Sequence, residues 1–191
     1  MKFSIIGPSG YIAKRHLAAI ERLESPSIYS YLDIQDSDFL VKTKKSKFFI
    51  DQEEFFQDLE INPVNFLVIC SPNHLHFSQI LRSVEVGIPV ICEKPICITC
   101  EDLEVLNSLP DDKRDLIHSI MQLRLHPVAS QIKDLISSNH SSINANIQFL
   151  TRRDDAYKKS WKVKQEFSGG ILFNLGVHYF DLLFNVLGLP L

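Results

Sequence analysis

The chain has 191 residues, of which 45% are hydrophobic and 23% charged, and its formal net charge is −3. These values are typical of a globular protein long enough to bury a core. The slightly acidic balance gives no electrostatic basis for binding nucleic acid. The one basic run, residues 42–47, is predicted to be a solvated loop or helix face.

The start of the chain, MKFSIIG, enters a strand pattern directly and lacks the features of a secretory signal peptide. The four cysteines are Cys70, Cys92, Cys97 and Cys100. We therefore expect reduced thiols in a cytoplasmic protein. Cys97 and Cys100 form a C-x-x-C that could be a redox pair, but Thr99 and Asp102 favour a capped helix start. No second ligand pair has zinc-site spacing, so no metal is predicted.

Short apolar runs alternate with helical patterns through the first two thirds of the chain. Strands are predicted at residues 3–7, 28–33, 48–50, 66–70, 89–92 and 116–121, and helices at 13–23, 74–86 and 100–109. The run FLVIC at 66–70 is continuously apolar, which is typical of a strand covered on both faces. Strands that alternate with helices indicate parallel βαβ units and an α/β fold.

The pattern changes after about residue 122. A helix is predicted at 126–138 and a strand at 144–151, followed by a charged, irregular stretch at 152–166. We therefore expect a first domain at residues 1–121 and a second at 122–191.

The segment Gly7-Pro-Ser-Gly10-Tyr-Ile-Ala13 follows the first predicted strand and opens the first helix. Glycines at this place permit a tight turn and let a diphosphate approach the backbone, where the amides of the helix N-terminus hold it. Asp33 ends the second strand, at the distance where a carboxylate accepts hydrogen bonds from a ribose 2′-hydroxyl. Because a carboxylate repels a 2′-phosphate, NAD is favoured over NADP. The alternative is a plain turn followed by a strand-end aspartate.

Two further polar stretches follow predicted strands. Cys70-Ser-Pro-Asn-His-Leu-His76 follows the strand at 66–70, and Glu93-Lys94-Pro95 follows the strand at 89–92. Ligands of open parallel sheets bind at the carboxyl ends of the strands, so both stretches are candidates for a ligand site. Taken alone, Glu93-Lys94-Pro95 could equally be a surface turn.

Together these motifs resemble the glucose-fructose oxidoreductase/inositol dehydrogenase/MocA (Gfo/Idh/MocA) family of NAD(P)-dependent oxidoreductases. The matching elements are the glycine turn with Tyr11, Ile12 and His16, then Ser71–His76, then Glu93–Pro95, and finally Gly169, Gly170, Gly176, His178 and Asp181. The resemblance implies a Rossmann doubly wound parallel sheet that binds NAD, followed by an α+β substrate domain.

The resemblance also implies roles for individual residues. The implied cofactor-binding residues are Gly7, Gly10, Tyr11, Ile12, Asp33, Ser71, Pro72, Asn73, His76, Glu93, Lys94 and Trp161. The implied substrate-binding residues are Lys94, Arg124, Tyr157, Asn174 and His178. Lys94 and His178 would be catalytic, one of them as the general base, and the choice between them stays open.

Position 174 is Asn where most of the family has Asp. Asn174, together with residues 11–13, 122–127 and 160–162, makes the chain similar to the UDP-N-acetylglucosaminuronate 3-dehydrogenases. These enzymes act in the biosynthesis of bacterial surface polysaccharide such as lipopolysaccharide. This likeness implies oxidation of the C3 hydroxyl of a UDP-sugar acid by NAD. The alternatives are a non-catalytic NAD-binding remnant and a family member that acts on another sugar or polyol.

The apolar segment at 169–191 resembles a membrane span, but Asn174, His178, Asp181 and Asn185 interrupt it at helical spacing. These four residues would form one polar stripe on a helix, for which a membrane span has little use. We expect a helix that presents them to a cleft, or a core histidine bonded to Asp181, and no membrane partner.

Family members continue beyond this helix as a large sheet that forms the substrate-side wall and the interface of a homo-oligomer. The resemblance therefore implies that the second domain is incomplete. We expect residues 1–191 by themselves to associate and to turn over no substrate, even where NAD binds.

Overall fold

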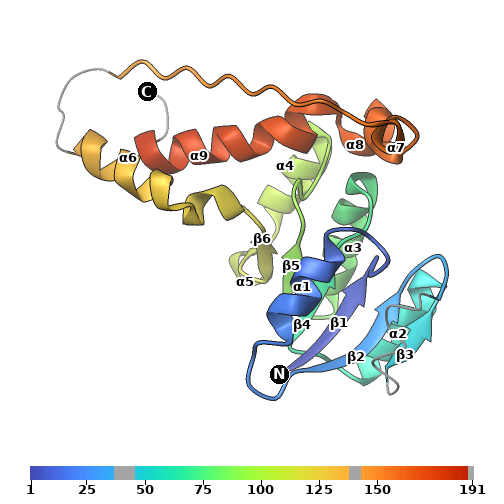
Figure 1. Ribbon diagram of the computed structural model, residues 1–191. Helices are drawn as coiled ribbons and strands as arrows, with labels where there is room; N and C mark the ends of the chain where they lie inside the picture. The colour runs from blue at the N-terminus through green and yellow to red at the C-terminus, as the bar shows by residue number, and fades with distance from the viewer. Residues whose placement is uncertain (37–45, 138–142, 189–191) are drawn as a thin grey trace. The chain divides into compact units, whose positions relative to one another are not determined.

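The computed structural model describes residues 1–36, 46–137 and 143–188 (Figure 1). The chain divides into two compact units, Met1–Ser119 and Ile120–Leu191. Most of the basic run at 42–47 lies outside the described residues, so the prediction for it stays open.

The first unit is built on a six-stranded sheet in the order β3-β2-β1-β4-β5-β6. The strands are β1 (Lys2–Ile6), β2 (Ser27–Leu32), β3 (Lys47–Phe49), β4 (Phe66–Ile69), β5 (Val90–Cys92) and β6 (Ile117–Ser119). Every neighbouring pair is parallel. The strand order reverses between β1 and β4, which confirms the doubly wound Rossmann fold expected from the sequence.

Five helices accompany these strands in the described part of the first unit: α1 (Ala13–Ile20), α2 (Gln52–Ile61), α3 (Asn73–Glu85), α4 (Cys100–Ser108) and α5 (Asp111–Arg114). The sequence pattern did not predict α2. Its buried residues, Phe55, Phe56 and Leu59, cover little more than one turn among acidic neighbours. The helix start is nevertheless well marked, because the Asp51 carboxylate accepts a 2.9 Å hydrogen bond from the Glu54 amide.

The core lies on both faces of the sheet. Leu67 and Ile69 of β4 pack into a cluster with α2 and α3, whereas Val68 of the same strand packs into a cluster with α1. Successive side chains of a strand point to opposite faces, so a strand covered on both sides must be apolar throughout. The prediction from the run FLVIC is confirmed.

The C-x-x-C segment is the start of a helix. The Thr99 hydroxyl accepts a 3.1 Å hydrogen bond from the Asp102 amide and caps α4. Cys97 is buried ahead of the helix and Cys100 is exposed in its first turn. Burial raises the pKa of Cys97 to about 11, which is opposite to the lowered pKa of a reactive thiol. The capping interpretation is confirmed over the redox one.

All the regular secondary structure among the described residues of the second unit is helical. It contains a 3-10 turn (Gln122–Leu125), α6 (Pro127–Ser137), α7 (Asp155–Lys158), a second 3-10 turn (Trp161–Val163), α8 (Gln165–Ser168), a π-helical turn (Leu172–Gly176) and α9 (Val177–Leu187).

The strand predicted at 144–151 is wrong, because this segment pairs with no other strand among the described residues. Its alternating pattern has no neighbour to supply backbone hydrogen bonds. It runs extended beside α9 instead, with the rings of Phe149 and Tyr179 5.3 Å apart between centroids (Figure 1).

The apolar end of the chain is less regular than its polar spacing suggests. α8 ends at Ser168, and Gly169, which caps it, has a left-handed backbone with φ 75°. The π-helical turn that follows contains Asn174, so the expected four-residue stripe on one α-helix is wrong at its first position. His178, Asp181 and Asn185 lie together on α9.

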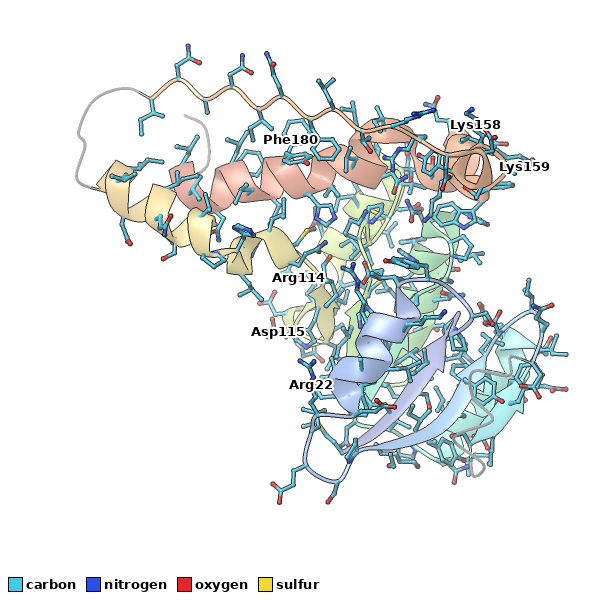
Figure 2. The ribbon with its side chains drawn as sticks, in the orientation of Figure 1. Arg22, Arg114, Asp115, Lys158, Lys159 and Phe180 are labelled. Atoms are coloured by element: carbon cyan, nitrogen blue, oxygen red, sulfur yellow. The ribbon has the colours of Figure 1, made fainter. Side chains whose placement is uncertain are left out.

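By length and composition alone, Gln165–Leu187 could cross a membrane, with a mean hydropathy of 1.4. Core helices of soluble proteins, which are mostly buried, pass the same test, whereas 11% of the apolar window of this segment is buried. Phe180 on α9 is 50% exposed, and Figure 2 shows its side chain on this helix.

Candidate functional site

The glycine turn after β1 approaches the backbone that follows β4. Gly7 has φ 73°, and a Cβ there would lie 2.9 Å from the carbonyl carbon of Cys70 and 2.9 Å from the nitrogen of Ser71. Any other residue would therefore both strain the turn and collide with the neighbouring loop. The Gly10 amide donates a 3.1 Å hydrogen bond to the Gly7 carbonyl and closes the turn. This close approach sets the N-terminus of α1 at the switch point of the sheet.

The Asp33 carboxylate lies beside the same turn. Its Oδ2 accepts a 2.9 Å hydrogen bond from the Ser9 amide, and its Oδ1 accepts a 2.8 Å bond from the Ile34 amide. The aspartate that follows β2 is thus fixed next to the turn that follows β1. A nucleotide whose diphosphate met α1 would bring its ribose toward this carboxylate.

A third link joins α1 to the loop after β5. His16 Nε2 lies 2.7 Å from Glu93 Oε1, and both side chains are nearly buried. The sequence motif had singled out His16 without giving it a role. The structure pairs it with one of the residues implied to bind the cofactor.

His76 joins the loops after β4 and β5. Its Nδ1 lies 2.7 Å from the Pro95 carbonyl oxygen and its Nε2 lies 2.8 Å from the Ser71 carbonyl oxygen. Burial lowers the pKa of His76. The β4–α3 loop is held further by the Ser71 hydroxyl, which donates a 2.6 Å hydrogen bond to Gln79 Oε1.

The first unit therefore brings most of the predicted cofactor residues to one edge of the sheet. The carboxyl ends of β1, β2, β4 and β5 are level there, since Ile6 pairs with Leu32 and Ile69, and Ile69 with Cys92. Tyr11 in the glycine turn is exposed, and Asn73 begins α3 as a buried residue. Backbone amides, a carboxylate and a helix N-terminus at one edge suit a dinucleotide.

In the second unit, Arg124 and Asp181 form a two-pronged ion pair. Arg124 Nε lies 2.8 Å from Asp181 Oδ2 and 3.0 Å from Oδ1, and a terminal guanidinium nitrogen also donates to Oδ1. The Asp181 side chain is 10% exposed and that of Arg124 is 52% exposed. Hydrogen bonding to Asp181 raises the pKa of Arg124. The pair ties the turn at 122–125 to α9, a link that sequence reasoning missed.

Besides Arg124, the second unit contains three predicted substrate residues, Tyr157, Asn174 and His178, and one predicted cofactor residue, Trp161, and these lie in two places. His178, which is 8% exposed, and Asn174 lie on α9 and on the π-helical turn before it. Tyr157 and Trp161 lie in the irregular stretch, where the Arg153 guanidinium sits 4.3 Å from the centre of the Tyr157 ring. Lys94 belongs to the first unit, so its approach to His178 stays a prediction.

Within the described ranges, no group of three His, Cys, Asp or Glu side chains could hold a metal ion.

Two family models match the chain. Residues 1–119 match the model described as "Oxidoreductase family, NAD-binding Rossmann fold", and residues 141–190 match its companion, "Oxidoreductase family, C-terminal alpha/beta domain". Both models carry the designation Gfo/Idh/MocA.

Solved structures with similar folds include the WlbA (WbpB) dehydrogenase from Thermus thermophilus in complex with NAD and UDP-GlcNAcA. It is 31% identical with a TM-score of 0.84, and the match covers 98% of this chain and 63% of that one. The WlbA dehydrogenase from Bordetella pertussis, in complex with NADH and UDP-GlcNAcA, is 22% identical with a TM-score of 0.78. This match covers 98% of this chain and 55% of that one. The second likeness speaks for the fold alone.

Among curated relatives, an uncharacterized oxidoreductase, ORF334 of Rhizobium meliloti, is 32% identical over 126 residues, which are 66% of this chain and 37% of that protein. Glucose-6-phosphate 3-dehydrogenase of Bacillus subtilis is 24% identical over 189 residues, covering 95% and 52%. The chain thus spans about half the length of these relatives or less.

Proposed function

The chain belongs to the Gfo/Idh/MocA family of oxidoreductases, and from this premise we propose that it serves the NAD-dependent oxidation of the C3 hydroxyl of a UDP-N-acetylhexosaminuronic acid. Its first unit is an NAD-binding Rossmann domain. The observation that carries the substrate is the 31% identity to a Thermus thermophilus enzyme solved with NAD and UDP-GlcNAcA. That substrate would place the reaction in the cytoplasmic synthesis of sugars for surface polysaccharide.

The preference for NAD over NADP rests on Asp33. Its carboxylate is already oriented by two backbone amides, so it is ready to accept hydrogen bonds from a ribose diol. A 2′-phosphate in the same place would meet a fixed negative charge. We expect Asp33→Ala to weaken NAD binding and to reduce the discrimination against NADP.

Calorimetric titration with both dinucleotides tests this preference. Equal or tighter NADP binding by the unaltered chain would contradict it. Asp36→Ala is a matched control, because Asp36 accepts its hydrogen bond from the Tyr31 hydroxyl rather than from the glycine turn.

The oxidation requires a hydride acceptor and a base. In the proposed reaction, the C3 hydrogen of the sugar leaves as a hydride, for which bound NAD is the acceptor. The hydroxyl proton goes to Lys94 or His178, and the second of these residues orients the hydroxyl. Arg124 is engaged by Asp181, so in this conformation its role toward the substrate is to hold α9.

We propose residues 1–121 as the cofactor domain and residues 122–191 as part of a substrate domain. Turnover would then need the further fold that longer relatives have, and association into a homo-oligomer would use the same domain. NAD binding by residues 1–121 would not require that further fold.

A second candidate substrate is a sugar phosphate. The likeness to glucose-6-phosphate 3-dehydrogenase of Bacillus subtilis covers 95% of this chain and concerns the same C3 position of a hexose. Because turnover is expected to need the further fold of the longer relatives, the assay uses a chain completed by that fold. In the completed chain, a rise in NADH with UDP-GlcNAcA but not with glucose 6-phosphate would support the first proposal, and the reverse would support the second. NAD binding by the completed chain without turnover of either sugar would favour a non-catalytic remnant.

The catalytic residues are tested most clearly in the longer Thermus thermophilus relative, at the positions aligned with Lys94 and His178. Removal of a general base lowers turnover by about 10²–10⁴-fold. NAD affinity should change far less. Alanine at the position aligned with His118, an exposed residue of β6 in this chain, is the control. Near-normal turnover by both site variants would contradict the assignment.

A further inference from the structure

One buried histidine lies between the two loops that carry most of the polar cofactor residues. His76, in the first turn of α3, is 1% exposed. One ring nitrogen meets the carbonyl of Ser71 after β4 and the other meets the carbonyl of Pro95 after β5, at 2.8 and 2.7 Å. A ring so placed presents no polar atom to a dinucleotide, although the family resemblance implied a cofactor contact.

Both partners of His76 are carbonyl oxygens, which can only accept. A neutral imidazole has a single N–H, so it donates to one carbonyl at a time, and both bonds together need a second proton. Burial opposes that proton, and so does the Lys94 ammonium group, whereas the two carbonyls and the Glu93 carboxylate favour it. Acidification should therefore complete the second bond.

Each loop is also fixed to a helix of the same unit. Ser71 donates to Gln79 of α3, whose amide nitrogen lies 3.2 Å from Gln52 Oε1 at the start of α2. Glu93 is held at 2.7 Å by His16 of α1. His76 adds a direct connection between the loops, so it controls the distance from one to the other.

We propose that His76 is a positioning residue for NAD: its bonds to Ser71 and Pro95 hold the two loops at the separation that the cofactor requires. The proposal rests on the proposed function, in that both loops are taken to border bound NAD. In this proposal His76 acts on NAD through the two loops and does not contact the cofactor itself.

Three variants of the full chain separate the two bonds. His76→Gln places an amide nitrogen near the position of Nε2 and can keep the bond to Ser71. His76→Asn places one near Nδ1 and can keep the bond to Pro95. His76→Leu keeps neither. At a pH below the pKa of His76, where the ring makes both bonds, we expect NAD dissociation constants to rise by about threefold to tenfold for one lost bond and by about tenfold to a hundredfold for both.

Ile80→Val is the matched control for a general loss of packing. Ile80 lies one turn further along α3, is fully buried in the core and, being apolar, offers no hydrogen bond to either loop. It should lower the melting temperature and leave the NAD dissociation constant unchanged. If His76→Leu does not fold, the Asn and Gln variants still decide the proposal. NAD affinities equal to that of the unaltered chain in the folded His76 variants would overturn it.

A pH profile supplies a readout that a purely structural role would not move. The affinity of the unaltered chain for NAD should increase as the pH falls through the pKa of His76, because the second bond forms. The titratable groups that face His76 are Glu93 and Lys94, and His16 acts on it through Glu93. The increase should persist in His16→Gln and be lost in His76→Gln. A profile unchanged in His76→Gln would contradict the proposal.

Amide hydrogen exchange without cofactor separates this proposal from the proposed function. Loosened loops should exchange faster at the amides of Ser71, Asn73, Glu93, Lys94 and Ile96 in His76→Leu and His76→Asn than in Ile80→Val. Failure of the unaltered chain to bind NAD would defeat the proposed function, while the exchange rates would still decide the role of His76. Unchanged exchange at both loops would overturn it.

Discussion

The two units of the chain differ in how far they bury their apolar side chains. In the first unit, large side chains such as Phe55, Leu67 and Ile80 are completely buried on the two faces of the sheet. Among the described residues of the second unit, the only buried hydrophobic side chains are Ala129 and Val186. The first unit therefore has its own core, whereas the second leaves a large apolar surface uncovered.

The polar residues of the second unit show the reverse pattern. On α9, His178 is buried and Asp181 is mostly covered and paired with Arg124, while Phe180 and Phe184 are about half exposed. A surface helix of a globular protein normally buries its apolar side. On α9, the Asp181 carboxylate is thus engaged within its own unit, while the Phe180 and Phe184 rings remain about half exposed.

The largest expected effect on stability comes from comparing two phenylalanines, one in each unit. Phe55→Ala in α2 should lower the free energy of unfolding of the first unit by about 3–5 kcal/mol, because it leaves a cavity in a closed core. Phe180→Ala in α9 should change stability by less than about 0.5 kcal/mol. Urea unfolding followed by circular dichroism measures both. Equal losses at the two positions would remove the contrast.

The exposed apolar side chains of α9 and of the π-helical turn before it are expected to drive association of the isolated chain. Size-exclusion chromatography with light scattering should detect species larger than a monomer, and the double change Leu172→Ser with Phe180→Ser should shift them toward the monomer. Arg22→Ser, a change on the surface of the first unit, is the control. A stable monomer of the unaltered chain would contradict this prediction.

The Arg124–Asp181 pair should contribute a smaller amount to the free energy of unfolding of the second unit. The guanidinium is half exposed, so solvent screens the interaction, and Arg124→Gln should cost about 1 kcal/mol. Because the mostly covered Asp181 then lacks its cation, Asp181→Asn in the same chain should restore part of the loss. Amide hydrogen exchange in α9, which follows local unfolding of this helix, measures both the loss and its partial recovery. Unchanged exchange in Arg124→Gln would show that the pair does not hold this helix.

The smallest effect concerns pH and the first unit. The pKa of His76 is lowered in the folded chain, so the unfolded chain takes up a proton first as the pH falls. Stability is therefore lost as the pH drops below about 6.5, the ordinary histidine value, and this loss ends below the folded pKa. Parallel melting curves should show a weaker acid dependence in His76→Gln. An identical dependence would mean that other groups cause it.

The sequence predicted the first unit far better than the second. The β4 run and the Gly7 turn are local signals whose structural meaning does not depend on distant parts of the chain. α2 was missed because its apolar positions span little more than one turn. The strand at 144–151 was wrong because alternation indicates a strand only where a partner strand exists.

Part of the candidate site could not be predicted for the same physical reason. Asp33 and Glu93 were found because each follows a strand in a known topology. The bond from Asp33 to Ser9, the pairing of His16 with Glu93 and the pairing of Arg124 with Asp181 join residues far apart in sequence. The π-helical turn around Asn174 also escapes a search for α-helical spacing.

The most direct test of this account is a calorimetric titration of NAD into residues 1–191 and, in parallel, into residues 1–119, the part that matches the NAD-binding family model. If the first unit has its own core and holds the cofactor with its own loops, both chains should fold and bind one NAD with similar affinity. A folded 1–119 chain that did not bind NAD would contradict the account.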